Sequence, residues 1–253
     1  MKRNIVILFA IVLSIASVAQ AQKTETAKPA APAQNLPTVK EVLDKYVKAV
    51  GGRAAIEKIK SRTLTGTVEI TAMNLKGTFE AYNAPEGKSY SKTVLTGVGE
   101  LLEGTDGKTA WVVNPFQGNR EKTGAELTQS RLINDFYRDL NLEKLFPKME
   151  LKGIEKVGEK DAYVITATAE GVPSETWYFD TKSGLMLRSD VTAIAPEGNQ
   201  PISFFFEDYR SVDGLMVAHR IRNQTPSFVM TMTVGEIKHG LPVDETKFAR
   251  PKQ

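Results

Sequence analysis

A two-residue hydrophobic period runs through most of this chain from Arg62 onward. In the first such stretch Leu64, Val68 and Ile70 alternate with threonine and glutamate residues. This alternation is typical of a β-strand that buries one face. The joins between stretches are short, as at Asp106-Gly107, so we expect a mostly antiparallel sheet. Further strands are predicted around 75–81, 89–95, 101–104, 109–113, 152–157, 162–169, 175–180, 185–191, 202–209, 216–223 and 228–237.

Helical periodicity is confined to two parts of the chain. Thr38 can cap a first helix, whose apolar residues recur at three- and four-residue spacing up to Val50, and a short helix follows over 54–59. Residues 123–141 predict a further helix, extended over 142–146. Its apolar stripe would consist of Leu132, Ile133, Phe136, Tyr137 and Leu140.

The number of strands limits the folds that are available. Strand twist accumulates, so an antiparallel sheet of more than ~10 strands curls or splits. Since few helices are available to cover the sheet, we predict a mainly β fold with minor α content. It would be a curved antiparallel sheet that forms an incomplete β-barrel capped by helices. A two-sheet sandwich is the alternative. We expect residues 38–253 to form this single domain.

The N-terminal residues read as a secretory leader. Lys2 and Arg3 precede an apolar run, and Ala19-Gln20-Ala21 fits a cleavage site, so we predict a signal peptide over 1–21 and a periplasmic protein. Residues 22–37 are rich in alanine and proline and predict a disordered linker. Loss of the two leader cations takes the formal charge from +3 to +1. A near-neutral chain argues against nucleic-acid binding. No apolar run after residue 21 is long enough to span a bilayer, so we do not expect an integral membrane protein.

The sequence carries no recognisable catalytic or metal-binding pattern. It has no cysteine, which excludes disulfides, thiolate metal sites and a cysteine nucleophile. His219 and His239 are too far apart for a paired metal motif, and we expect both at the surface. Nucleophile-elbow, dinucleotide and phosphate-loop motifs are missing as well. We therefore predict no enzyme activity, no cofactor and no metal.

Aromatic and methionine residues occupy every second position of several strands. Met230 and Met232 share a face of one strand, and Phe204 and Phe206 share a face of another. A packed core is one interpretation of these side chains. The other is a ligand cavity, because a dozen strands can enclose more volume than their side chains fill, and such a lining suits hydrocarbon. The 123–141 helix would then be a lid, or a permanent part of the packing. The predicted ligand-binding residues are Phe79, Trp111, Leu132, Phe136, Trp177, Phe204, Phe206, Met230 and Met232.

Four segments resemble a known family. Residues 106–116 read D-G-K-T-A-W-V-V-N-P-F and resemble the D-G-K-x-x-W-x-x-N-P-F segment of the periplasmic lipoprotein carriers, in the LolA/LolB-like superfamily. Residues 243–248 are similar to the closing V-D-x-x-x-F of these carriers. The segments over 209–221 and 46–52 resemble those of outer-membrane lipoprotein-sorting relatives, with Ala218 in place of their usual proline.

The resemblance implies an open β-barrel capped by helices, with an apolar cavity for the acyl chains of lipoproteins in transit to the outer membrane. One departure is Ala84-Pro85, where the carriers have an arginine before the proline that helps to hold their lid shut. The gated release associated with that arginine is therefore not carried over to this chain.

Three functions follow as hypotheses. The first is a periplasmic binding or carrier protein for lipid or acylated ligands, with a role in lipoprotein sorting. The second is a non-enzymatic envelope module that has a filled barrel core and docks a protein partner. The third, a hydrolase, lacks a nucleophile or carboxylate pair that the sequence brings together.

Overall fold

The computed structural model describes residues 36–116, 118–242 and 244–251. The predicted signal peptide lies outside the described residues, as does the predicted linker except for Leu36 and Pro37. The described part of the chain forms one compact unit that begins at Leu36.

Thirteen antiparallel strands make up one sheet in the part of the chain that the structure describes. Their spatial order is β6-β5-β4-β3-β2-β1-β13-β12-β11-β10-β9-β8-β7, so β6 and β7 are the two edges. The strands are β1 Arg62–Ile70, β2 Leu75–Ala84, β3 Lys88–Leu95, β4 Gly99–Asp106, β5 Ala110–Asn114, β6 Gly118–Lys122, β7 Lys148–Val157, β8 Lys160–Thr168, β9 Glu175–Asp180, β10 Met186–Ala193, β11 Gln200–Val212, β12 Leu215–Gln224 and β13 Val229–His239.

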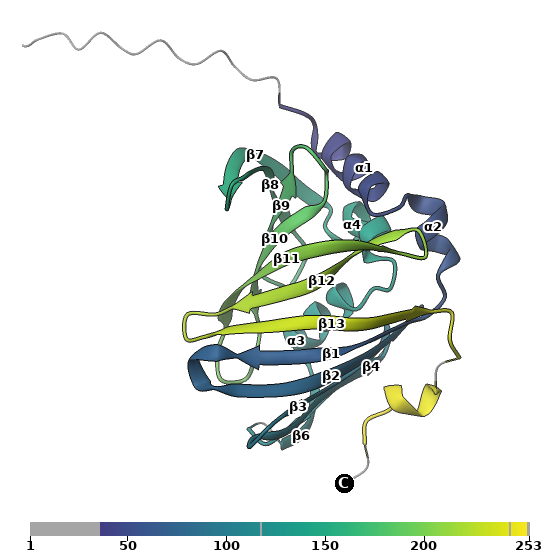
Figure 1. Ribbon diagram of the computed structural model, residues 1–253, viewed down its shortest axis with the longest axis vertical. Coiled ribbons are helices and arrows are strands. Elements are labelled where there is room, and N and C mark those ends of the chain that lie inside the picture. The colour runs from purple at the N-terminus through teal and green to yellow at the C-terminus, as the bar shows by residue number, and fades with distance from the viewer. Residues whose placement is uncertain (1–35, 117, 243, 252–253) are drawn as a thin grey trace, which may run out of the picture. The chain divides into compact units, whose positions relative to one another are not determined.

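The sheet is curved and does not close, which confirms the predicted fold class and excludes the sandwich (Figure 1). The first and last strands, β1 and β13, pair in the middle of the sheet, so the two ends of the domain meet there. The register shifts between Thr65 and Gly66 in β1 and between Leu151 and Gly153 in β7. Such irregularities increase local twist and help a sheet to curl.

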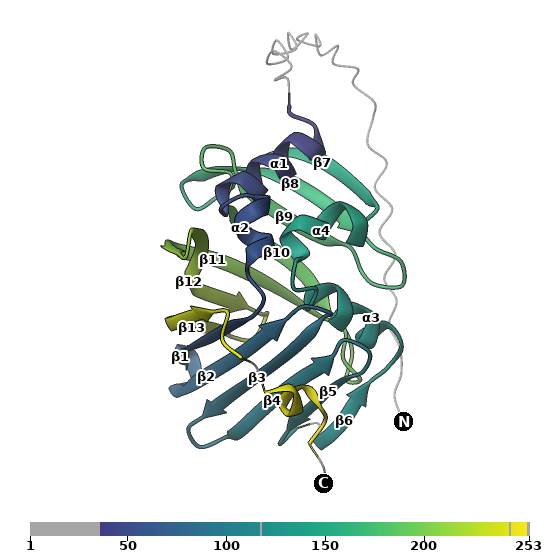
Figure 2. The same ribbon diagram turned by 90° about the vertical axis from the view of Figure 1, so that its right-hand side faces the viewer.

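The α-helices of the described residues lie on the concave side of the sheet (Figure 2). Those helices are α1 Val39–Ala49, α2 Arg53–Lys58, α3 Gly124–Ile133 and α4 Arg138–Leu145. The start of α1 is a capping box, in which the Thr38 hydroxyl accepts from the Glu41 amide and the Glu41 carboxylate accepts from the Thr38 amide. In Figure 2, α1, α2 and α4 cover the part of the sheet made of β7–β10.

The predicted helix over 123–141 is wrong as a single helix. The chain forms α3 and α4 with a turn between them, and Phe136 and Tyr137 lie in that turn. Asp135 stabilises the break, because its carboxylate accepts from the Tyr137 amide at 2.9 Å and from the Asn141 side chain at 2.9 Å. Such local side-chain bonds compete with a continuous helix.

The principal core fills the space between the helices and β7–β10. Trp177, Phe179 and Phe146 are fully buried there. The rings of Phe146 and Trp177 meet edge to face with their centroids 5.0 Å apart, and Tyr46 of α1 lies 5.0 Å from Phe179. One half of the concave face is therefore packed solid by helices.

Candidate functional site

Six of the nine predicted ligand-binding residues point to one face of the sheet. Residues that pair across antiparallel strands share a face, so the register assigns them. Met232 pairs with Val68 on one side and with Ile221 on the other, and Ile221 pairs in turn with Phe206. This is the concave face, since Trp177 on it contacts Phe146 at the end of α4. The six residues are Phe79, Trp177, Phe204, Phe206, Met230 and Met232.

The helices close off Trp177 completely. Its side chain is fully buried, and its indole N–H donates to a carboxylate oxygen of Glu175 at 2.7 Å. The same oxygen accepts from Arg138 of α4 at 2.6 Å, in an ion pair with a Glu175 side chain that is 5% exposed. A ligand could reach this indole only by displacing α4. Trp177 is thus part of the packed half of the concave face.

The other half of the concave face is more open, although Met230 and Met232 pack there against the buried residues Val68, Ile70 and Leu95. Phe204, Phe206, Met230 and Met232 are all only partly buried, although each points toward the inside of the curve. Phe79 lies beside them at 7% exposure and packs over Gly66, where a Cβ would overlap its ring. We call Phe204, Phe206, Met230 and Met232 the apolar face. A surface of this composition, partly exposed within a concave sheet, suits hydrocarbon.

Trp111 does not lie with the other aromatic residues. It pairs with Gly104 and points to the opposite, convex face. It is 1% exposed there, and its indole N–H donates to the Phe248 carbonyl at 2.9 Å. Phe248 ends a short 3₁₀ helix, Glu245–Phe248, that covers this part of the sheet. Trp111 therefore anchors the C-terminal segment and is remote from the apolar face.

Leu132 and Phe136 lie apart from the apolar face as well. They line a cavity of about 400 Å³ between the α3–α4 segment and the turns that join β2 to β3 and β4 to β5. Gly87 and Gly107 belong to those turns. Leu132 and Phe136 thus share a cavity, but the other predicted ligand-binding residues do not line it.

A second cavity, of about 270 Å³, lies where the packed and open halves of the concave face meet. Polar groups reach it from several elements. Tyr46 donates to Asp139 at 2.6 Å, and Tyr209 donates to the Met186 carbonyl at 2.8 Å. Burial raises the pKa of Tyr46 well above its ordinary value, and the neighbouring Asp139 raises it further. Burial also lowers the pKa of Arg62, against the opposing effect of Asp139.

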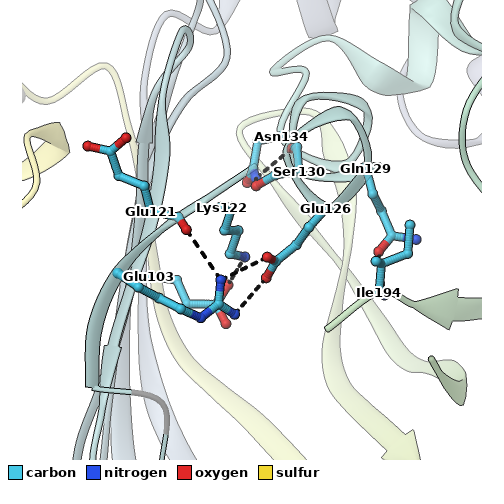
Figure 3. Close-up of polar contacts among 9 residues, drawn as sticks. Glu103, Glu121, Lys122, Glu126, Gln129, Ser130, Asn134 and Ile194 are labelled. Atoms are coloured by element: carbon cyan, nitrogen blue, oxygen red, sulfur yellow. Dashed lines mark hydrogen bonds and ion pairs between the residues drawn. The ribbon is translucent and has the colours of Figure 1, made fainter. Parts of the chain in front are cut away.

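Polar contacts tie α3 to both halves of the sheet, as Figure 3 shows. On one side Arg120 of β6 donates to the two carboxylate oxygens of Glu126 at 2.8 and 2.9 Å. On the other side the Gln129 amide donates to the Thr192 carbonyl at 2.8 Å, and its oxygen accepts from the Ile194 amide at 3.0 Å. The helix therefore bridges from the β6 edge to β10 across the opening of the sheet.

The most buried residues of α3 are polar. Gln129 and Ser130 are its buried residues. A void of about 50 Å³ remains beneath it, large enough to hold water. The lining of this void includes Ser89, Ser91, Glu103, Thr105, Lys122, Ser130 and Asn134. Apart from Leu132, which packs against the principal core, α3 is thus held to the sheet by hydrogen bonds and one ion pair.

No protein-family model matches the sequence, and no curated protein matches it. Solved structures match over most of the chain. A DUF1329 family protein from Desulfovibrio piger superposes with a TM-score of 0.57 at 16% identity, over 85% of this chain and 98% of its own. A LolA superfamily protein from Nitrosomonas europaea gives a TM-score of 0.55 at 12% identity, over 85% and 98%. This chain has the LolA-like fold.

A third match agrees with this assignment. A domain from Vibrio parahaemolyticus, described as an outer membrane lipoprotein-sorting protein, gives a TM-score of 0.54 at 13% identity, over 83% of this chain and 97% of its own. The predicted resemblance is thus confirmed at the level of the fold. At these identities the likeness shows the fold of this LolA-like domain and does not show its ligand.

The residues that carried the resemblance have structural roles. Asp106 closes the β4–β5 turn by accepting from the amides of Lys108 and Thr109 at 2.8 and 2.7 Å. Although burial opposes it, these amide donors lower the pKa of Asp106. Asn114 accepts from the Phe116 amide at 2.9 Å in the next turn. The D-G-K-x-x-W-x-x-N-P-F segment therefore shapes two turns and anchors Trp111.

Metal-ligating side chains do not cluster in the described part of the chain. No group of three or more His, Cys, Asp or Glu side chains among the described residues could hold a metal ion. The expected surface position of His219 is wrong, because this residue is 7% exposed and its Nδ1 lies 2.9 Å from the Val217 carbonyl. His239 also has a buried side chain, which contacts Asp213. Within the described ranges, no helix is long and apolar enough to cross a membrane.

The polar groups of the 270 Å³ cavity were not predicted. Tyr46, Arg62 and Asp139 are distant in the sequence and belong to α1, β1 and α4. A partial signal was present in Arg62, a cation that begins the alternating face continued by Leu64 and Val68. A charge at that position of a strand faces the interior once the register is known.

Proposed function

We propose that this protein binds the hydrocarbon chains of lipids or acylated proteins in the bacterial envelope, and that it carries or sorts them there. The observation that supports the proposal most strongly is the apolar face of Phe204, Phe206, Met230 and Met232, which is partly exposed inside a concave sheet. We further propose that residues 1–21 direct it to the periplasm, and that it has no enzyme activity and needs no cofactor.

The energetics of the apolar face favour an alkyl ligand. Removing apolar surface from water stabilises a complex by roughly 25 cal/mol per Å², so a long chain laid across the four side chains gains several kcal/mol before the entropic cost of binding. Methionine side chains adapt their shape to irregular ligands. The face is also wide, because it extends over β11, β12 and β13 toward β1.

The binding surface can be tested with two neighbouring substitutions. Met232→Glu would place a carboxylate in the apolar face, whereas Thr233→Glu would place it on the exposed convex face of the same strand. Burying an unpaired carboxylate against hydrocarbon costs several kcal/mol. We therefore expect Met232→Glu to weaken the displacement of an apolar dye by palmitate by at least about 100-fold, and Thr233→Glu to leave it unchanged. Equal effects of the two variants would contradict the proposed surface.

Bound ligand can also be sought directly. Native mass spectrometry of the gently purified protein should reveal an added lipid mass that organic extraction removes. If the protein carries no such mass and palmitate displaces no dye, lipid binding is excluded.

We also propose that α3 is the segment that moves when a ligand enters. Lifting α3 would expose Leu132, but its two buried residues and its bonds to the sheet are polar, so water can replace those bonds. Lifting α4 would instead expose the fully buried Phe146 and Trp177. The substitution Glu126→Gln removes the ion pair between Glu126 and Arg120. The Glu126 side chain is only 14% exposed, so solvent screens this pair weakly. Such a bond contributes about 1–2 kcal/mol.

The expected result for Glu126→Gln is faster opening of α3. Amide hydrogen exchange in Gly124–Ile133 and release of a bound fatty acid should both accelerate by about 5–30-fold. Glu100→Gln is the matched control, because Glu100 pairs with Lys92 on β3 and β4 and does not contact α3. If exchange accelerates but ligand release does not, α3 is not the gate.

A second candidate function is a docking module of the envelope. The observation that favours it is the solid packing of β7–β10 around Trp177, which leaves only part of the concave face open. A partner protein recovered from envelope extracts at equal stoichiometry, with no lipid bound, would support this function over lipid transport.

A further inference from the structure

Arg62 occupies an unusual position at the start of β1. It lines the 270 Å³ cavity together with Tyr46 of α1, Asp139 of α4 and Phe206 of β11. The residue is only partly exposed, and helices α1, α2 and α4 all contribute to the walls around it. A permanently charged guanidinium is thus held inside the domain, where charged groups normally have partners.

The hydrogen bonds of Arg62 leave most of its donors unused. Its Nε donates to Nε2 of His239 at 3.2 Å, and Nδ1 of His239 lies 2.9 Å from a carboxylate oxygen of Asp213. Since Nε2 accepts, Nδ1 carries the proton and donates to Asp213. This chain fixes the orientation of the guanidinium. Its two terminal nitrogens have no hydrogen-bond acceptor and no carboxylate within 4.0 Å among the described residues.

The other charged groups of the cavity are already engaged. Asp139 accepts the hydroxyl of Tyr46 at 2.6 Å, and Arg138 is paired with Glu175 at 2.6 Å. Burial lowers the pKa of Arg62 and the charge of Asp139 opposes that shift, but the side chains of Arg62 and Asp139 form no hydrogen bond. The two terminal nitrogens of the guanidinium therefore have no hydrogen-bonded partner among the described residues. Arg62 is therefore the cation of this cavity that is free to take a single anionic group.

The apolar face continues directly from this cavity. Leu64, Phe206 and Ile221 line the cavity and also belong to the concave face, and Ile221 pairs with Met232. Along β1 the same face runs from Arg62 to Val68, a distance of about 20 Å at the usual rise of a strand. A charged group at Arg62 would thus lie at one end of a continuous hydrocarbon surface.

We propose that Arg62 binds the anionic head group of an amphiphilic ligand, a carboxylate or a phosphate, while the alkyl chain lies on the apolar face. This inference rests on the proposed lipid binding and specifies the class of lipid. The planar fork of an arginine matches two oxygens of a carboxylate or phosphate, and such charge-assisted pairs are strong when water is excluded. A neutral alcohol or ester of the same chain length can accept a hydrogen bond from the fork but cannot compensate its charge.

The test compares ligands that share one alkyl chain. Palmitate, hexadecyl phosphate and hexadecan-1-ol are titrated against a bound apolar dye, below their aggregation concentrations. For the unaltered protein we expect at least one of the two anions to bind about tenfold or more tightly than the alcohol. Which anion binds more tightly distinguishes a fatty-acid ligand from a phospholipid-like one.

Substitutions of Arg62 test whether this residue causes the preference for anionic ligands. Arg62→Gln should lose the preference and bind anions and alcohol within about twofold of each other. Arg62→Lys keeps the charge without the fork and should show an intermediate preference. Arg220→Gln is the control, because Arg220 is an exposed cation on the convex face that pairs with Glu207. Thermal denaturation confirms that each variant is folded.

The outcomes separate the two proposals. Equal binding of anions and alcohol by the unaltered protein would overturn the role of Arg62 and leave lipid binding intact. An anion preference that survives Arg62→Gln, or that disappears equally in Arg220→Gln, would also overturn it. If none of the three ligands displaces the dye, both proposals fail.

Discussion

Replacing Trp177 with alanine is expected to lower the free energy of unfolding by about 3–5 kcal/mol. The side chain is fully buried between β9 and the end of α4, where its ring meets that of Phe146 edge to face. Truncation removes the apolar contacts and leaves a cavity, and the two effects add for a large aromatic residue in a rigid core. It also leaves Glu175 without the indole donor that lies 2.7 Å away.

Phe204 is the matched comparison for Trp177. Both residues pair with Ser189 and point to the concave face, but Phe204 is partly exposed and lies on the open half. We expect Phe204→Ala to cost only about 1 kcal/mol in stability and to weaken fatty-acid binding. Urea denaturation and dye displacement, measured for both variants, distinguish core from ligand surface. A Phe204→Ala variant as unstable as Trp177→Ala would mean that the open half is ordinary core.

The second large effect is expected at the buried ion pair of Glu175 and Arg138. Glu175→Gln should lower the free energy of unfolding by about 3 kcal/mol, because it leaves the guanidinium of Arg138 without its counter-charge. The value lies at the low end for a broken buried pair, since the Arg138 side chain is 22% exposed. The glutamine oxygen can still accept from Trp177, so the substitution isolates the loss of charge.

Two controls make this prediction specific. Asp44→Asn breaks the pair with Lys40 on the surface of α1, where both side chains are about two-thirds exposed, and should cost less than about 1 kcal/mol. Combining Glu175→Gln with Arg138→Met removes both charges and should recover most of the lost stability. Denaturant midpoints at neutral pH measure all four proteins. A double variant no more stable than Glu175→Gln alone would assign the loss to packing.

The local hydrophobic pattern predicted most of the strands. It did not predict the strand that has no apolar residues. The stretch that begins β1 alternates clearly and was predicted, whereas β6 has the sequence G-N-R-E-K and was not. It becomes a strand because it pairs with β5 at the edge of the sheet. The break between α3 and α4 was missed for a similar reason, since it depends on the side-chain bonds of Asp135.

The alternating pattern was enough to predict the curved antiparallel sheet, because a long run of period-two stretches joined by short turns has few other ways to bury its apolar side. It also determined that Met230 and Met232 share a face. Which side chains of different strands share a face depends on the pairing register, and that register places Trp111 on the convex face. Only the tertiary structure brought Arg62, Tyr46 and Asp139 around one cavity. The reason is that register and helix docking are contacts between distant segments, and no local period of a sequence encodes them.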